Sequence, residues 1–275
     1  IQQIITNEYG QKSGIITSAL ASFGIMINIV AQILAANSLL SSMFGLSPEL
    51  SAIISVILMA CYVIFGGVLS TGVLGVIKLI LIYISVILCA VLAIKLSGGF
   101  TEVYGSLPHD KYFNLFSRGM GIDGGAFLSV VFGVLSTQTY IQAVLSGKSN
   151  NASIKGTLIS SVLIPPIGIG GILIGLYMRI NFPNIVSGQA FPLFIIYNMP
   201  PFIGGAILAT LLIALVGTGS GMALGFGAII TNDIYKKYIN KNADSKKELS
   251  VTRVVILISL AVSAMFTLGN LKSAV

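Results

Sequence analysis

Long apolar stretches separated by short polar segments dominate this chain, and seven of them can be marked from end to end. Each is close to the roughly 20 residues that an α-helix needs to cross the hydrocarbon core of a bilayer. In hydrocarbon the backbone polar groups must bond within the segment, which favours helices. The stretches cover residues 14–42, 48–66, 72–96, 125–146, 156–179, 201–230 and 250–270. The pattern predicts an all-α, polytopic transmembrane helix bundle of about seven spans, forming a single transmembrane domain over 1–275.

The composition excludes other classes of protein. Hydrophobic residues make up 55% of the chain and charged residues 8%, whereas an ordinary soluble domain carries about 25% charged residues. The net charge is +7, and the lysines that produce it cluster between the spans, as the positive-inside rule describes. The expected partner is therefore the lipid bilayer and not nucleic acid. No span carries the acid, His or Cys cluster of a membrane enzyme. Cys61 and Cys89 fall within apolar spans and predict small buried side chains.

The distribution of basic residues predicts the orientation. Residues 231–253 hold the densest group of lysines and arginines, which places this segment in the cytoplasm. Alternation then puts nine of the fifteen basic residues inside and five outside. We therefore expect a multi-pass plasma-membrane protein with a cytoplasmic N-terminus and an external C-terminus. Residues 189–199 are too short to span and predict a re-entrant or interfacial helix. A chain that opens on Ile1 and stops just after a span is expected to be a fragment.

The sixth span contains a concentration of small and hydroxyl residues. Three glycines and two hydroxyls follow one another at 217–221. A break in the helix there would free carbonyls and hydroxyls to hold an ion near the membrane midplane. The alternative is close helix packing through small residues, and spacing alone favours packing. The segment concerned runs from Ala214 to Gly221, and Ser220 within it is a candidate to line the solute path.

Polar residues in other spans add further candidates. Asn28 and Gln32 are four residues apart and share one helix face, where amides bond between helices or line a solute path. Thr137 and Gln138 belong to a polar ending of the fourth span, which either caps the helix or lines an inner exit. Pro165-Pro166 predicts a structural kink in the fifth span.

Lys78 is almost the only charge within any predicted span. An ionisable group in hydrocarbon costs several kcal/mol and marks a functional site by default. The alternative is that its long stem snorkels to the inner interface. Lys78 is seven residues past Thr71, roughly 10 Å into the span at about 1.5 Å per residue, so both alternatives stay open.

Three segments, taken in order, resemble the sodium:solute symporter family, whose core is the leucine-transporter-type inverted repeat. The first is a Tyr62-Val-Ile-Phe-Gly66-Gly67 turn, and the second is the stretch from Gln138 through Gln142 to Lys148. The third is Ala214 with Gly217-Thr218, followed by Asn232-Asp233-Ile234-Tyr235. The resemblance implies that the seven spans correspond to core helices three to nine of ten, with part of each repeat missing.

The resemblance also makes the departures informative. In relatives with the second sodium site, a carbonyl and two hydroxyls of the eighth core helix hold the ion. Carried over, these are Ala214, Gly217 and Thr218, so one hydroxyl is lost. The family's acidic residue after the Gly-Gly turn matches Gly75, and its following Gln matches Lys78. These changes weaken a sodium site, and a lysine ammonium can occupy the vacated place.

The resemblance implies a secondary active transporter that couples a small organic solute to a cation by alternating access, with no cofactor other than a possible sodium ion. Sodium is the family default, and proton coupling or sodium independence through Lys78 is the competing scheme. A sensory or regulatory module built on a symporter-like bundle is the alternative of a different class. Where the family's sugar carriers use polar and aromatic residues, residues 130–134 (VVFGV) have no polar side chain, which favours an organic acid, an amino acid or a similar nutrient.

Overall fold

The computed structural model describes residues 2–66, 70–136, 138–145, 147–240 and 244–273. Within these ranges the chain is helical and has no strand. It divides into two compact units, residues 1–78 with 209–275 and residues 79–208. The helix bounds are α1 Gln2–Phe44, α2 Pro48–Gly66, α3 Ser70–Leu96, α4 Phe100–Ser106, α5 His109–Tyr112, α6 Met120–Ser136, α7 Gln138–Leu145, α8 Asn150–Asn181, η1 Ser187–Gln189, α9 Ala190–Asn198, α10 Pro201–Ile229, η2 Ile230–Ile239 and α11 Ser245–Ser273.

Five of the described helices are long and apolar enough to cross a membrane. They correspond to the predicted spans one, three, five, six and seven, and they confirm a multi-pass membrane fold. The second and fourth predicted spans appear as shorter apolar helices, Pro48–Ile64 and Met120–Leu135. The fourth span was predicted as one stretch over 125–146, whereas the described residues form two helices, α6 and α7, on either side of position 137.

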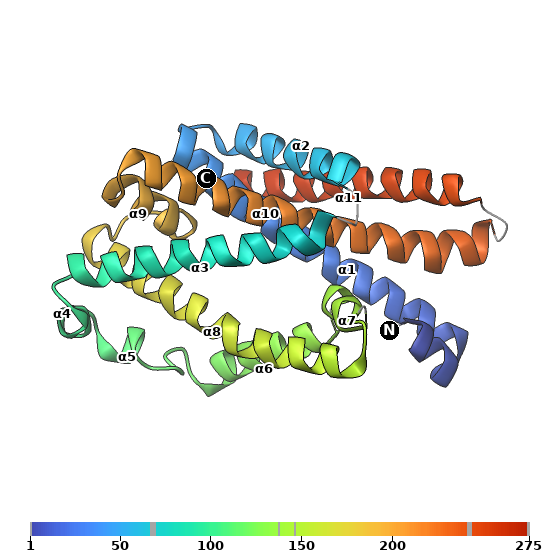
Figure 1. Cartoon of the computed structure of the whole chain (residues 1–275), viewed down its shortest axis with the longest axis horizontal. Helices are drawn as coiled ribbons and strands as arrows, with labels where there is room; N and C mark the ends of the chain where they lie inside the picture. The colour runs from blue at the N-terminus through green and yellow to red at the C-terminus, as the bar shows by residue number, and fades with distance from the viewer. Residues whose placement is uncertain (1, 67–69, 137, 146, 241–243, 274–275) are drawn as a thin grey trace. The chain divides into compact units, whose positions relative to one another are not determined.

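The first unit is held together by apolar side chains that recur at helical spacing. Along α1, Ile25, Ile29 and Ile33 are four residues apart and almost fully buried. This row packs in one core cluster with residues of the three other long helices of the unit, α2, α10 and α11. Figure 1 shows α2 and α11 lying side by side. The stripe is the signature of a helix that packs in a bundle.

The backbone of α1 changes conformation near its start, at Gly10. Gly10 has φ of +83° inside the assigned helix, a left-handed value that glycine adopts without steric cost. It separates the first turns from the apolar span that the sequence places from residue 14 onward.

In the second unit, α8 runs without interruption through Pro165-Pro166. The prolines remove two backbone donors, and the hydroxyl of Tyr83 on α3 donates to the carbonyl oxygen of Leu163 beside them. The short segment 190–198 is helical, as predicted, and Phe194 and Ile195 in it are fully buried. Tyr177 packs edge-on against Phe194 with ring centroids 5.3 Å apart.

The two cysteines differ in environment. Cys89 is buried, as predicted, whereas Cys61 is exposed in this chain, and both are free thiols. The prediction of a buried side chain at Cys61 was therefore wrong, because this position faces away from the core of the first unit.

Candidate functional site

The small-residue segment of α10 is an unbroken helix. α10 runs from Pro201 to Ile229, and no glycine between them has a positive φ. The structure therefore shows no break over 214–221, in keeping with the packing alternative that spacing favoured, and ion binding by these residues stays a prediction. The Thr218 hydroxyl donates to the carbonyl oxygen of Ala214 at 2.8 Å, the local bond through which Ser and Thr satisfy themselves inside helices.

The glycines of this segment admit neighbouring side chains. A Cβ atom at Gly219 would lie 2.8 Å from the sulfur of Met59 on α2 and 3.3 Å from the Cβ of Gln32 on α1. One residue on, the Ser220 hydroxyl donates to the carbonyl oxygen of Met59 at 3.0 Å, and Ser220 and Met59 are fully buried. The helices α1 and α2 thus meet α10 at this level, and the Ser220 hydroxyl forms a helix-to-helix hydrogen bond there.

Lys78 lies against the same helix, one turn from Ser220. Its ammonium nitrogen would be 2.7 Å from a Cβ atom at Gly217, and the Tyr62 hydroxyl would be 3.7 Å from the same point. Lys78 is half-buried. None of the ion pairs found among the described residues includes it.

The depth of this contact bears on the snorkelling alternative. The apolar span that contains Gly217 extends over Pro201–Lys237, so Gly217 is close to its middle. A snorkelling lysine would direct its ammonium toward the end of a span. The position of the Lys78 nitrogen therefore favours a role inside the bundle.

The two predicted amides of α1, Asn28 and Gln32, have different environments. Asn28 is exposed in this chain, and its side-chain nitrogen donates to the carbonyl oxygen of Gly24 at 2.9 Å. Gln32 is half-buried, and its side-chain oxygen is buried without a hydrogen-bond partner among the described residues. The continuous helix keeps them on one face, and of these two residues Gln32 presents the unused acceptor; Asn37, further along α1, also has a buried side-chain oxygen without a partner among the described residues.

The remaining predicted residues belong to the second unit. Thr137 lies outside the described residues, and Gln138 begins α7. Their proposed lining role stays a prediction.

A further polar group at the end of α10 was not among the predicted site residues. η2 is a π-helix, a form that often occurs at functional sites. In it Asp233 accepts a bond from Ser18 of α1 at 3.4 Å and pairs with Lys237 at 3.2 Å. The hydroxyls of Thr231 and Thr252 lie 2.9 Å apart and join η2 to α11. The Asn-Asp-Ile-Tyr motif pointed to this segment. The sequence did not reveal the partner of Asp233, because Ser18 is 215 positions away.

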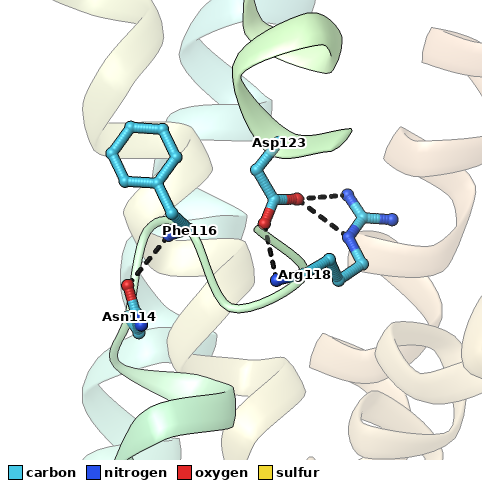
Figure 2. A network of polar contacts seen from close by, with 4 residues as sticks. All are labelled: Asn114, Phe116, Arg118 and Asp123. Atoms are coloured by element: carbon cyan, nitrogen blue, oxygen red, sulfur yellow. Dashed lines mark hydrogen bonds and ion pairs between the residues drawn. The ribbon is translucent and has the colours of Figure 1, made fainter. Parts of the chain in front are cut away.

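A compact ion pair joins the loop before α6 to the first turn of that helix in the second unit (Figure 2). Asp123 accepts the backbone N–H of Arg118 at 2.8 Å, and the guanidinium of Arg118 lies 2.7 Å from the same carboxylate. The backbone bond, followed by the side-chain bond, lowers the pKa of Asp123 from its ordinary value. Asn114 accepts the backbone N–H of Phe116 at 2.9 Å in the preceding turn. These bonds fix the entry of the chain into α6.

The described residues contain no group of three or more His, Cys, Asp or Glu side chains that could hold a metal ion. His109 instead stacks on Tyr104 with ring centroids 4.0 Å apart. Any cation at the α10 segment would therefore meet carbonyl, hydroxyl, amide or phenol oxygens.

Comparisons with known proteins agree with these observations. The sodium/pantothenate symporter of Haemophilus influenzae is 26% identical over 145 residues, which cover 52% of this chain and 30% of that protein. The sodium/proline symporter of Salmonella typhimurium is 24% identical over 240 residues, covering 82% of this chain and 47% of that protein. The chain thus spans less than half of either curated relative.

The fold also matches a solved structure. A Na⁺-coupled sialic acid symporter, in a substrate-bound outward-open state, superimposes with a TM-score of 0.76 at 17% identity, over 99% of this chain and 61% of that one. The sequence model of the sodium:solute symporter family matches residues 1–274. The chain belongs to the sodium:solute symporter family.

Proposed function

We propose that this chain forms part of a secondary active transporter that moves a small organic solute across the plasma membrane, coupled to a cation, by alternating access. The observation that carries the proposal is the family match over residues 1–274, on a chain with five described membrane-length helices. The seven predicted spans would be core helices three to nine, with the N-terminus in the cytoplasm.

The relatives support a class of solute. Pantothenate, proline and sialic acid, which appear in the names of the relatives, all carry a carboxylate. The apolar VVFGV segment at 130–134 argues against a neutral sugar. We therefore propose a small carboxylate-bearing nutrient, either an organic acid or an amino acid.

Sodium is the first candidate for the coupling ion, because it appears in the name of every relative compared above. The carried-over ligands Ala214, Gly217 and Thr218 suit it poorly. Gly217 has no side-chain oxygen, and the other two oxygens are bonded to each other at 2.8 Å. A hard cation prefers several oxygen ligands.

Lys78 is the second candidate for the coupling charge. Its ammonium lies against Gly217 near the middle of the span, at the position where the family resemblance places a sodium-binding hydroxyl. In this scheme Lys78 supplies the positive charge, and a proton replaces sodium as the coupled ion.

The activity is tested with the full-length natural protein reconstituted into proteoliposomes. Radiolabelled carboxylate solutes are offered under an inward sodium gradient, an inward proton gradient, both or neither. We expect one of the gradients to concentrate at least one solute above its equilibrium level. Equilibration at the same rate and to the same level with and without gradients would contradict cation-coupled transport.

A further inference from the structure

The buried row of α1 becomes polar near the turn that joins α1 to α2. Asn37 follows Ile33 at the same spacing as the isoleucines before it and is 4% exposed. On α2 the buried row starts with Ser51 and Ser55, both fully buried, and becomes apolar at Met59. The two helices pack against each other, so both bury polar side chains beside their connection.

The buried face of α11 changes in the same way. Leu260 belongs to the apolar core cluster of the first unit, whereas Ser263 and Thr267, further toward the C-terminus, are polar and fully buried. α11 packs against both α1 and α2. Figure 1 shows the end of α11 at the same end of this unit as the turn between α1 and α2. Each of the three helices therefore contributes buried polar residues at one end of their contact.

The core cluster brings these polar residues together. Ala36, beside Asn37, and Ala52, beside Ser51, are both members of the cluster. Leu268, near the end of α11, packs against the same cluster. The polar side chains of the three helices accordingly surround one end of a shared core.

One oxygen atom on each helix is buried without a hydrogen-bond partner among the described residues: Asn37 Oδ1, Ser51 Oγ and Ser263 Oγ. The hydroxyls one turn along, on Ser55 and Thr267, donate to backbone carbonyl oxygens of their own helices at 2.7 and 2.9 Å. Inside helices this local bond is the usual way to satisfy a hydroxyl, and Ser51 and Ser263 do not use it. Buried polar atoms are nearly always paired, with protein or with ordered water. Three unpaired oxygens at one end of one core therefore indicate a bound molecule.

We infer that a buried water site joins α1, α2 and α11 at Asn37, Ser51 and Ser263. The amide oxygen of Asn37 can only accept a hydrogen bond, whereas the two hydroxyls can donate and accept. The bridging molecule must therefore donate to Asn37 and is free to accept from a serine, which water does. A buried water typically makes about three hydrogen bonds, and the site offers one group on each of three helices.

The same chemistry argues against a cation at this place. A cation would use the oxygen lone pairs but would accept nothing from the serine hydroxyls. The three groups include no carboxylate to balance its charge, and burying an unbalanced charge is costly. The site thus holds the three helices together by hydrogen bonds where their apolar contacts end. Because hydrogen bonds are directional, it also fixes how each helix is rotated about its axis.

The first test is thermal unfolding of the purified full-length protein with Asn37→Leu, Ser51→Ala and Ser263→Ala, made singly and together. Each single change leaves the bridge without one partner and should lower the melting temperature by about 2 °C or more. The triple variant leaves no polar group unpaired, so it should lose clearly less than the sum of the three single losses. If the triple variant is not monodisperse, Ser51→Ala with Ser263→Ala is compared with its two single variants under the same criterion.

Ser22→Ala is the matched control. Ser22 is also on α1 and buried, and its hydroxyl oxygen has no partner in the part of the chain that is described. It is fifteen residues before Asn37, about 22 Å away at about 1.5 Å per residue. Its effect should therefore add to that of Asn37→Leu without coupling.

The second test identifies the bound molecule by solving the full-length wild type at a resolution that shows ordered water, with and without a thallium salt. We expect density within about 3.2 Å of all three oxygens that gains no anomalous signal from thallium. Three results would overturn the inference: strictly additive losses in the combined variant, direct hydrogen bonds among the three side chains with no density between them, or thallium bound at the site.

Discussion

Gly170 in α8 and Gly217 in α10 each let a side chain from α3 come nearer than a Cβ atom would allow, but the two neighbours differ in kind. At Gly170 the neighbour is the Cγ1 methyl of Val86, with the Cβ of Ala90 and the Val86 carbonyl oxygen both 3.6 Å from the ideal Cβ. At Gly217 it is the ammonium of Lys78. A β-branched side chain on a helix has one strongly preferred rotamer, whereas a lysine end has several.

The comparison separates two uses of glycine in membrane helices. At Gly170 the missing side chain lets two helices pack closely, the usual role of small residues in bundles. At Gly217 it makes room for a charge that can move. The first should matter chiefly for stability and the second chiefly for the coupling ion, and the following substitutions test that division.

The largest effect on stability is expected from Gly170→Leu. The new side chain meets Val86, which cannot rotate away without entering a disfavoured rotamer, and overpacking of this kind costs about 1–3 kcal/mol or more. Thermal unfolding and the yield of monodisperse protein in detergent report the loss. Gly171→Leu is the control, because Gly171 has open space around its ideal Cβ. Equal loss at both positions would show that the close approach to Val86 does not matter.

The same small substitution at both glycines sharpens the comparison. Gly170→Ala should lower the melting temperature by several degrees, corresponding to about 1 kcal/mol or more, and Val86→Ala should restore part of it. Gly217→Ala should cost less stability, because the lysine end can move aside, but should alter the pH dependence of uptake. If Gly217→Ala destabilises as much as Gly170→Ala with an unchanged pH profile, Gly217 is another packing glycine.

Ser220→Ala should have a moderate effect. It removes the buried bond to the Met59 carbonyl oxygen, at a cost of about 1 kcal/mol. Ser259→Ala is a matched control, since Ser259 is equally buried but bonds within its own helix, to Ile256. A smaller loss for Ser259→Ala in thermal unfolding is expected. The helix-to-helix bond would be unimportant if the two variants unfolded alike.

The smallest effect is expected at the Arg118–Asp123 pair, in which the arginine is exposed and the aspartate is half-buried. Its bonds lower the pKa of Asp123 in the folded state. The stabilisation is therefore present above the ordinary carboxyl pKa of about 3.9 and is lost as the pH falls through the lower folded value. Asp123→Asn should slightly lower the melting temperature at pH 7 and match wild type near pH 3. Asp110→Asn is the control, and a difference that persists unchanged at low pH would contradict this role.

The helix bundle could be predicted from the sequence because an apolar segment in hydrocarbon must satisfy its backbone hydrogen bonds internally, which favours a helix. The bounds of α2 and the existence of the short helix at 190–198 followed directly. The sequence left open whether α10 breaks over 214–221, with spacing favouring packing, and the structure has an unbroken helix there. Glycines and hydroxyls open a helix when their neighbours are ions or solute, and they pack it when their neighbours are side chains. Here those neighbours are Met59 and Lys78, which only the tertiary structure brings to α10.

The site was predictable in part. Lys78 and Gly217 were both found as departures from a family pattern, but their apposition required coordinates. Tyr62 belongs to the Tyr…Gly-Gly motif, but nothing in the sequence indicated that its hydroxyl approaches Gly217. The contact between Asp233 and Ser18 could not be predicted either, because Ser18 lies on a helix at the other end of the chain.

The central claim, that the Lys78 ammonium takes the place of a free coupling cation, is tested most directly by solute uptake in choline medium across external pH. The full-length wild type, Lys78→Gln and Lys95→Gln are compared. We predict that wild type and Lys95→Gln retain uptake without sodium and respond to pH, and that Lys78→Gln loses the response to pH. Uptake that stops in choline, with Lys78→Gln behaving like wild type in sodium at every pH, would contradict the claim.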